Sequence, residues 1–273
     1  MTTPIQYQGN TAVITGAASG IGTGLARQAA KLGMRLVLAD VNADALHAFA
    51  ATLDAETLAV PTDVTQPESV QALADKAWDR FGGVTLLFNN AGLMATGFSW
   101  EITPERYDRC MGVNFGGVLN GIRSFVPRML KDGKPGRIVN TASIGGFLPS
   151  PLMSPYSASK FAVVALSESL WGELRMLQST IGVHLLAPGP VQSGIFNDPF
   201  GDAGNNPATQ QFVQLMRDTL TQNGMTPDEM ARRAFAGIDA GSYWLFPHPE
   251  HLFPALEKRV AAILNEQDPP SFP

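Results

Sequence analysis

A glycine-rich turn between an apolar run and a helix-like segment constrains the fold of this chain most strongly. The run Thr11–Thr15 is apolar and β-branched and stops at Gly16, so it predicts a short buried strand. Apolar residues then recur at helical spacing within 21–32, after Gly20 and Gly22. A strand, a glycine turn and a helix suit a phosphate-binding loop, because backbone N–H groups can approach the phosphates there. An ordinary tight turn is the alternative, since the spacing differs from the usual Gly-x-Gly-x-x-Gly.

Strand-like and helix-like segments alternate along the chain, which predicts an α/β fold with a parallel sheet. The expected strands are residues 11–15, 35–40, 58–64, 84–88, 136–142 and 182–187, with a last one within 239–246. The expected helices are residues 21–32, 43–53, 67–81, 103–131, 155–178 and 252–267. Length alone allows one large domain or two small ones, but no linker or repeat divides the sequence. We expect a single-domain Rossmann-type doubly wound parallel sheet with helices on both faces, spanning residues 1–273.

Small or polar residues follow six of the expected strands. In a doubly wound sheet, ligands bind at the edge formed by the carboxyl ends of the strands. The candidate ligand residues are Gly16–Gly22, Asp40, Asp63, Asn90, Ser143 and Pro188–Ser193. Their shared location is stronger evidence for a ligand site than any single motif.

Asp40 ends the second expected strand, 18 residues after Gly22. An acid at about this distance binds the adenosine ribose hydroxyls in a dinucleotide fold, and its charge would repel a 2′-phosphate. No basic residue follows at Val41 or Asn42, and Ser19 in the turn is neutral. These observations favour NAD over NADP. The alternative is an ordinary aspartate in the turn that ends a strand.

Ser143, Tyr156 and Lys160 form a second candidate group. Tyr156 and Lys160 stand four residues apart, so on a helix they share one face. A phenol ionises near pH 10, and a nearby ammonium group lowers that pKa. Such a tyrosine could exchange a proton with an alcohol or ketone oxygen that Ser143 also holds. For an isolated pair we would prefer the alternative, in which Tyr156 caps a core edge and Lys160 is solvated.

Asn114 lies inside the helix expected over 103–131 and is followed by Gly116 and Gly117. A polar residue beside paired glycines indicates a local distortion of the helix. The alternative is a buried asparagine whose amide is satisfied by backbone groups.

Composition and charge exclude several classes of function. The net charge is −5 and no lysine or arginine run stands out, so we expect no nucleic-acid partner. Cys110 is the only cysteine, which rules out an intrachain disulfide and a cysteine metal cluster. No metal site is expected from the four histidines either, which we interpret as structural or solvent-facing: His47, His184, His248 and His251. Neither a signal peptide nor an 18-residue apolar run occurs, so we expect a cytoplasmic protein without membrane contact.

The ordered motifs over roughly the first 195 residues resemble the classical short-chain dehydrogenase/reductase family. The match begins with Thr15-Gly-Ala-Ala-Ser-Gly20-Ile-Gly22 and continues through Asn89-Asn90-Ala91-Gly92, Asn114, Ser143 and Tyr156-Ser-Ala-Ser-Lys160. The resemblance implies reversible hydride transfer between a nicotinamide cofactor and a secondary alcohol or ketone. The cofactor-binding residues that it implies are Gly16, Ser19, Gly20, Ile21, Gly22, Asp40, Asp63, Val64, Asn90, Ala91, Gly92, Tyr156, Lys160, Pro188, Gly189, Val191 and Ser193.

The resemblance also implies individual catalytic roles. Tyr156 would be the general acid/base, and Ser143 would orient and polarise the carbonyl. Lys160 would lower the pKa of Tyr156 and bind the nicotinamide ribose, while Asn114 would hold a water in a proton relay. The backbone of Val191 and the hydroxyl of Ser193 would fix the carboxamide; the family usually has threonine in place of Ser193.

The resemblance further implies a homotetramer paired through the helices expected over 103–131 and 155–178. Two other functions stay open on the same fold: an NADP-preferring carbonyl reductase, and a catalytically idle NAD-binding sensor.

The substrate region is expected to be apolar. Residues 194–227 carry few strand signals and are interpreted as a substrate lid. The charged candidates there are few, namely Asp198, Asp202 and Arg217. The expected pocket residues are Met94, Phe147, Met153, Ile195 and Phe196. Such a wall suits a bulky hydrophobic secondary alcohol or ketone, aromatic or alicyclic. The segments 188–193 and 243–249 are also similar to those of aryl-alcohol Cα-dehydrogenases.

The C-terminal part of the chain, 239–273, is expected to close the structure. Its helix carries four apolar side chains that we expect to face inward, namely Leu256, Val260, Ile263 and Leu264.

Overall fold

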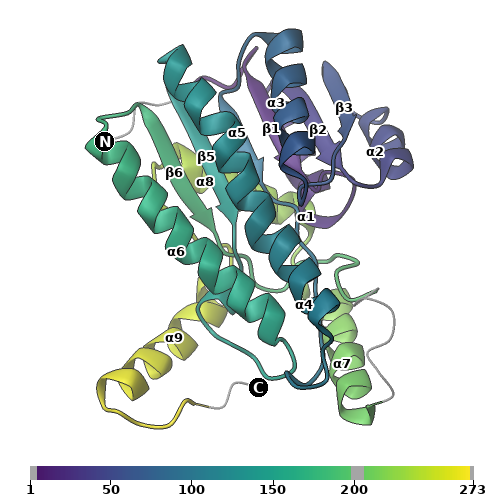
Figure 1. Ribbon diagram of the computed structural model, residues 1–273, viewed down its shortest axis with the longest axis vertical. Coiled ribbons are helices and arrows are strands. Elements are labelled where there is room, and N and C mark those ends of the chain that lie inside the picture. Colours follow the sequence, from purple (N-terminus) through teal and green to yellow (C-terminus); the bar gives the residue numbers. More distant parts are fainter. Residues whose placement is uncertain (1–4, 198–205, 271–273) are drawn as a thin grey trace.

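The computed structural model describes residues 5–197 and 206–270. Within them, seven strands form one sheet in the order β3-β2-β1-β4-β5-β6-β7, and every neighbouring pair is parallel (Figure 1). The strands are β1 (Thr11–Thr15), β2 (Arg35–Asp40), β3 (Thr57–Pro61), β4 (Leu86–Asn89), β5 (Gly136–Thr141), β6 (Ile181–Leu186) and β7 (Trp244–Leu245). The order runs outward in both directions from the β1–β4 pair, as expected for a doubly wound sheet.

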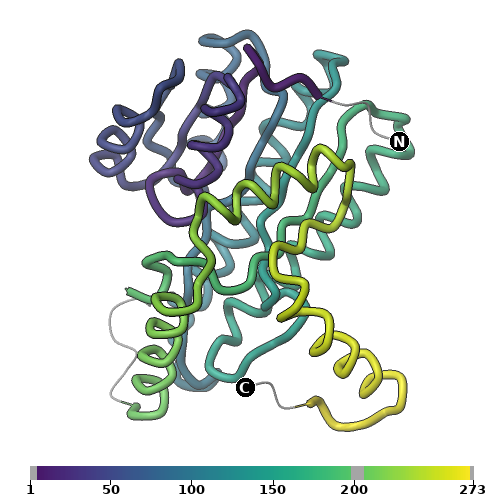
Figure 2. Tube along the Cα trace, turned by 180° about the vertical axis from the view of Figure 1, so that it is seen from behind, coloured from purple at the N-terminus to yellow at the C-terminus, as the bar shows by residue number. Residues whose placement is uncertain are grey.

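Helices cover both faces of the sheet (Figures 1 and 2). One face packs on α3 (Pro67–Phe81), α5 (Gly117–Asp132) and α6 (Ser154–Met176), and the other on α1 (Gly20–Lys31) and α8 (Pro227–Asp239). The remaining helices are α2 (Ala43–Ala50), α4 (Pro104–Met111), α7 (Pro207–Asn223) and α9 (Pro249–Leu264). Because both faces are covered, strands β1, β4, β5 and β6 are buried along their whole length rather than at alternate residues. In β1, Val13 faces the α3 side while Ala12 and Ile14 face α1 and α8.

The helix expected over 103–131 is interrupted where the sequence indicated a distortion. A π-helical turn, Gly112–Gly116, separates α4 from α5 and contains the fully buried Asn114. At Gly117 an added Cβ would come within 2.8 Å of the Val64 side chain, so the glycine lets α5 approach the end of β3. π-turns of this kind are frequent at functional sites.

Two helices, α7 and α8, were not expected from the sequence. Each begins with a capping side chain followed by proline, a common start signal. Asn206 accepts a hydrogen bond from the backbone N–H of Ala208 at the start of α7, and Thr226 accepts one from Glu229 in α8. Helix α8 packs closely on α1. Gly24 of α1 makes this contact possible, since an added Cβ there would overlap the Pro227 carbonyl. The strand expected within 239–246 shortens to the two residues of β7.

The C-terminal helix forms as expected, but the prediction that its four apolar side chains face inward was wrong. Helix α9 extends away from the sheet (Figures 1 and 2), and its buried residues are Leu252 and Ala262. Ile263 is 57% exposed and Leu264 is 77% exposed; Val260 is also exposed, and Leu256 is half-buried. The apolar stripe is therefore wider than the surface that the chain offers to cover it.

None of the helices in the described ranges combines the length and apolar character that crossing a bilayer requires.

Candidate active site

The glycine turn after β1 leaves an open helix N-terminus. Gly16 and Gly20 have positive φ angles of 65° and 49°, which favour glycine, and an added Cβ on Gly22 would overlap the Gly16 carbonyl. Ser19 stands at the N-cap of α1 but makes no side-chain cap, and the first turn contains no acid. Within the described part of the chain, neither Ser19 nor an acid of the first turn caps the first N–H groups of α1, which fits a pyrophosphate group.

Asp40 connects this turn to the end of β2. One carboxylate oxygen, Oδ2, accepts a hydrogen bond from the Ala18 N–H at 3.0 Å, and the other accepts one from Asn42 at 3.0 Å. The neighbouring Val41 is exposed and neutral. Asp40 therefore places a negative charge beside the glycine turn with no basic residue next to it in sequence.

The end of β4 is held against the same turn by Thr15, whose role the sequence analysis missed. The Thr15 hydroxyl accepts hydrogen bonds from the N–H groups of Asn90 (2.9 Å) and Ala91 (3.1 Å), and the Asn90 amide donates to the Thr15 carbonyl. An added Cβ on Gly16 would stand 2.8 Å from the Ala91 Cα. A hydroxyl directly before Gly16 was the available signal for this contact.

The segments that follow β3 and β6 also lie at the carboxyl edge of the sheet. The Asp63 carboxylate accepts hydrogen bonds from the backbone and hydroxyl of Thr65, so it shapes the turn after β3. Val64 is buried, and its carbonyl accepts a bond from the Asn120 amide of α5 at 2.9 Å. After β6, an added Cβ on Gly20 would stand 3.1 Å from the Ser193 Cβ, so this segment lies against the glycine turn.

Ser143, Tyr156 and Lys160 come together at the ends of β5 and α6. Tyr156 is buried beside Ser143, since an added Cβ on Gly145 would stand 3.2 Å from the Tyr156 ring and 3.5 Å from the Ser143 hydroxyl oxygen. The Ser143 hydroxyl accepts a hydrogen bond from the Gly145 N–H at 3.0 Å. The Lys160 ammonium lies 5.7 Å from the centre of the Tyr156 ring and donates to the Thr141 carbonyl at 2.9 Å. Lys160 is 3% exposed, so the alternative of a solvated lysine is wrong.

Burial sets the ionisation of this pair. It raises the pKa of Tyr156 to about 12, against a lowering by the Ser143 hydrogen bond and a further rise from nearby Cys110. It lowers the pKa of Lys160 to about 8. The pKa of Tyr156 thus moves opposite to the expected direction, because burial removes the hydration of the phenolate. At neutral pH the protein's own groups hold Tyr156 as a protonated phenol.

Asn114 connects the loop after β4 to helix α6. Its side-chain oxygen accepts from the Leu93 N–H at 2.8 Å, and its amide donates to the Leu93 carbonyl at 3.0 Å, so backbone groups do satisfy it. The amide also donates to the Ser159 hydroxyl at 2.9 Å, which in turn donates to the Tyr156 carbonyl. An added Cβ on Gly92 would stand 3.4 Å from both the Asn114 oxygen and the Lys160 ammonium, so Gly92 leaves space between them.

An apolar cluster borders Tyr156. It contains four of the five expected pocket residues, Met94, Met153, Ile195 and Phe196, together with side chains of α7. Phe147 was placed wrongly, because it belongs to another cluster and packs on Trp244 and Phe246, with ring centres 5.8 and 5.6 Å away.

The charged candidates of the lid differ in position. Arg217 on α7 donates to the carbonyls of Phe196 (2.8 Å) and Asn197 (3.3 Å) and so holds the backbone of this pocket wall. Asp198 and Asp202 lie outside the described residues.

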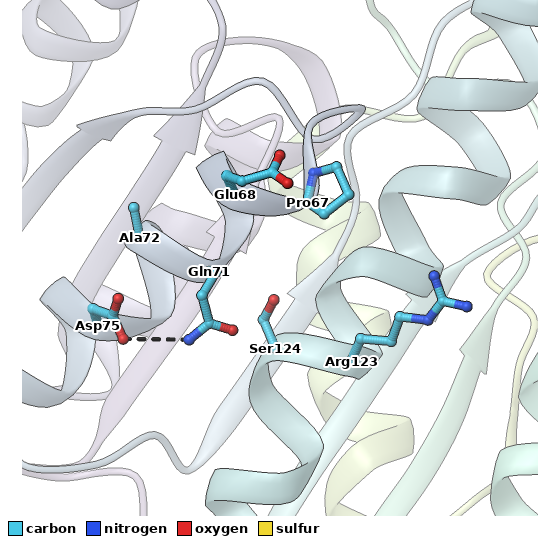
Figure 3. A pocket seen from close by; sticks show the side chains of 7 residues that line it. All are labelled: Pro67, Glu68, Gln71, Ala72, Asp75, Arg123 and Ser124. Atoms are coloured by element: carbon cyan, nitrogen blue, oxygen red, sulfur yellow. Dashed lines mark hydrogen bonds between the residues drawn. The ribbon is translucent and has the colours of Figure 1, made fainter.

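A separate open groove of about 390 Å³ lies between α3 and α5 (Figure 3). Its lining residues are Pro67, Glu68, Gln71, Ala72, Asp75, Arg123 and Ser124. None of them belongs to the candidate site, and within the groove Gln71 donates to Asp75. The groove is open and most of its lining residues are polar, whereas small-molecule sites are concave and mostly apolar. Across the described residues, no group of three or more histidine, cysteine, aspartate or glutamate residues could hold a metal ion.

Comparisons with known proteins support the fold described above. Residues 10–202 match the family model of the short chain dehydrogenases. A C alpha-dehydrogenase of Sphingobium sp. is 33% identical, over 96% of this chain and 88% of its own. A 1-deoxy-11-beta-hydroxypentalenate dehydrogenase of Streptomyces exfoliatus is 40% identical, over 77% and 78%. A short-chain dehydrogenase/reductase of Burkholderia phymatum, solved in complex with NAD, is 36% identical with a TM-score of 0.94, covering 98% of this chain and 99% of that one.

The chain belongs to the short-chain dehydrogenase/reductase family. It is an oxidoreductase, and its fold binds a nicotinamide cofactor. Solved relatives hold either NAD or NADP, so family membership does not decide between the two.

Proposed function

We propose that this protein is an NAD-dependent dehydrogenase that interconverts a bulky hydrophobic secondary alcohol and its ketone. The observation that carries the proposal is the buried position of Tyr156 and Ser143 beside each other, with an apolar cluster on one side and Lys160 on the other. Two hydroxyls that converge in an apolar surrounding suit a single carbonyl or alcohol oxygen.

Tyr156 is the general acid/base in this proposal. As a protonated phenol it donates its proton to the oxygen of a ketone, and as a phenolate it accepts the proton of an alcohol. Ser143 holds the same oxygen by a hydrogen bond, since its own hydroxyl is fixed by the Gly145 N–H. Stabilising charge on that oxygen lowers the barrier most in a site that excludes water.

Lys160 and Asn114 support Tyr156 from the side of the sheet. The Lys160 ammonium lies near enough to the ring to stabilise the phenolate and to donate to a ribose hydroxyl. We propose that Asn114 acts in the proton relay beside Lys160, because Gly92 leaves space between the two groups. Its bond to Ser159 fixes the first turns of α6 relative to the π-helical turn.

The cofactor lies along the carboxyl edge of the sheet in this proposal and supplies the hydride donor or acceptor when bound. The N-terminus of α1 would hold the pyrophosphate, and Asp40 would hold the adenosine ribose. Residues Asn90 to Gly92 would lie beside the nicotinamide ribose. The segment from Pro188 to Ser193 holds its nicotinamide end. Asp40 favours NAD, because a 2′-phosphate would meet a carboxylate that two backbone N–H groups already fix in place.

The substrate proposal rests on the apolar wall formed by Met94, Met153, Ile195 and Phe196. The two relatives named above are, by their names, dehydrogenases, one of them for a hydroxypentalenate. We further propose that the chain is one domain, that residues 194–227 act as the lid, and that copies pair through α5 and α6 into a tetramer.

A substrate panel with both cofactors tests the function. We expect turnover of aryl and alicyclic secondary alcohols with NAD⁺ to exceed that of sugars and short hydroxy acids. A clear preference for the charged or sugar substrates would contradict the substrate class, and a higher kcat/KM with NADP⁺ would contradict the role of Asp40.

A further inference from the structure

His248 joins the C-terminal part of the chain to the segment that follows β6. The Gly189 N–H donates to the His248 Nδ1 at 3.1 Å. An added Cβ on Gly189 would stand 3.0 Å from the His248 Cγ and 3.2 Å from its Nδ1, so the ring fills the space beside this glycine. Although the sequence analysis treated His248 as structural or solvent-facing, it is 4% exposed and contacts the segment proposed to bind the cofactor.

The hydrogen bond fixes the protonation state of the imidazole. A backbone N–H can only donate, so Nδ1 must carry a lone pair and the proton of the neutral ring must lie on Nε2. In the imidazolium form, two N–H donors, one on Nδ1 and one on Gly189, would face each other. Among the described residues Nε2 is buried without a hydrogen-bond partner, so no hydrogen bond at Nε2 stabilises an added charge.

The groups around the ring mostly oppose protonation. Burial lowers the pKa of His248 from its ordinary value, and the charges of His251 on α9 and Arg233 on α8 lower it further, whereas Glu250 and the Pro190 backbone raise it. Arg233 also donates to the Pro247 carbonyl at 2.6 Å, and it is itself held by Glu229. The residue before His248 is thus anchored to α8.

The segment from Pro188 to Val191 is held at three points. The Ile144 N–H, next to Ser143, donates to the Pro188 carbonyl at 3.0 Å, and Val191 forms a β-bridge with Met225. Between these two points, the bond to His248 is the side-chain contact that orients Gly189. Breaking it would leave a peptide N–H unpaired in the middle of the segment, where the backbone must face the cofactor.

We propose that neutral His248 is a positioning residue for cofactor binding. It holds the Pro188–Val191 segment in the conformation that receives the nicotinamide end, and its protonation at acid pH releases that segment and weakens binding. This inference rests on the proposed cofactor role of the segment.

The test compares the dissociation constant of NAD⁺ between pH 5 and 8 in the wild type, His248→Ala, His248→Asn and the control His251→Asn, measured by calorimetric titration. At pH 7.5 we expect His248→Ala to weaken binding about tenfold, because a buried N–H loses its acceptor. His248→Asn should stay within about threefold, since an amide oxygen can replace Nδ1 as acceptor. Wild-type affinity should fall as the pH drops below the ordinary histidine pKa. His251→Asn should show the same fall, at the same or a slightly higher pH, because the His251 charge opposes protonation of His248. His248→Asn should lack this fall.

Two results would overturn the inference while the wild type binds NAD⁺. One is an unchanged affinity in a folded His248→Ala, and the other is a His248→Asn variant with the full acid-side loss of the wild type. Thermal unfolding of each variant checks folding, and if His248→Ala does not fold, the pH profile of His248→Asn decides. A wild type that fails to bind NAD⁺ would overturn the proposed function and this inference together.

Discussion

The carboxyl edge of the sheet and helix α9 differ in how their residues are held. At the edge, Thr15, Asp40 and Asn90 each bond to the backbone of a neighbouring segment, and the glycine turn leaves no space for a side chain. Along α9, Ile263 and Leu264 are largely exposed although they continue an apolar stripe. Each residue at the edge is held by contacts with neighbouring segments, whereas the side chains of the outer turns of α9 make few contacts with the rest of the described chain. Substitutions should therefore have large effects at the edge and small ones at the end of α9.

Apart from Tyr156, the largest effect is expected for Ser143→Ala. The variant removes the hydroxyl that shares the reacting oxygen with Tyr156, so kcat should fall about 10²- to 10³-fold. Calorimetric titration should show NAD⁺ affinity within about twofold of the wild type, because Ser143 is assigned to the substrate oxygen. A kcat within tenfold of the wild type would show that Ser143 is not part of the catalytic set.

Gly22→Ala should damage both cofactor binding and stability. The new Cβ would overlap the Gly16 carbonyl, so the turn must shift, at a cost of about 1–3 kcal/mol. Gly172→Ala in α6 is the matched control, because nothing lies within 4 Å of its added Cβ, and it should be neutral or stabilising by about 0.5–1 kcal/mol. Chemical denaturation measures the stability of both variants, and calorimetric titration measures their affinity for NAD⁺. Equal effects of the two variants on stability would contradict the claim that the glycine turn has no space for a side chain.

Leu252→Ala and Leu264→Ser compare two positions on α9. Leu252 is 0% exposed, so its truncation should cost about 2–5 kcal/mol of unfolding free energy. Leu264→Ser should change it by no more than about 0.5 kcal/mol and leave kcat unchanged. If Leu264→Ser were as destabilising as Leu252→Ala, the outer turns of α9 would be covered, for instance by a second copy, and sedimentation at several protein concentrations would detect it.

Asp40→Asn should change the choice of cofactor. It keeps an acceptor for Ala18 or Asn42 but removes the charge that repels a 2′-phosphate, so the ratio of kcat/KM for NAD⁺ over NADP⁺ should fall at least about tenfold, or 1.4 kcal/mol. The control is Asp44→Asn, an acid in the first turn of the nearby helix α2. An unchanged ratio in Asp40→Asn would refute the assignment of NAD preference to this carboxylate.

Lys160 should also make the stability depend on pH. Its folded pKa, about 8, lies below the ordinary 10.5, so between these values the unfolded chain binds more protons at this site. The contribution of Lys160 to the unfolding free energy should therefore rise as the pH increases from 8 to 10. Subtracting the profile of Lys160→Met from that of the wild type isolates this rise, and a flat or falling difference would contradict the burial of an ammonium group there.

The sequence predicted the fold and the candidate site best where local chemistry decides the structure. The glycine turn, the position of Asp40 and the distortion at Asn114 each follow from residues within a few positions of one another. The sequence analysis missed Thr15 and Ser159, because their hydroxyls act by bonding to segments that are distant in the chain or to a main-chain carbonyl.

The errors occurred where position depends on distant parts of the chain. Phe147 was assigned to the pocket from its place after Ser143, but its ring packs on Trp244, about 100 residues away in sequence. The prediction that the apolar side chains of α9 face inward was also wrong. An apolar pattern indicates which face of a helix could be buried, but not which part of the chain covers it. The pKa of Tyr156 was misjudged because spacing brings Lys160 near but does not reveal the cost of burial.

The most direct test of the central claim is the turnover of Tyr156→Phe, which removes the hydroxyl and keeps the ring. We expect kcat to fall about 10²- to 10⁴-fold, the usual contribution of a general acid/base. NAD⁺ affinity should stay near that of the wild type, and Tyr107→Phe on α4, outside the site, should be fully active. A Tyr156→Phe enzyme that binds NAD⁺ and turns over within tenfold of the wild type would contradict the assignment of Tyr156 as the acid/base.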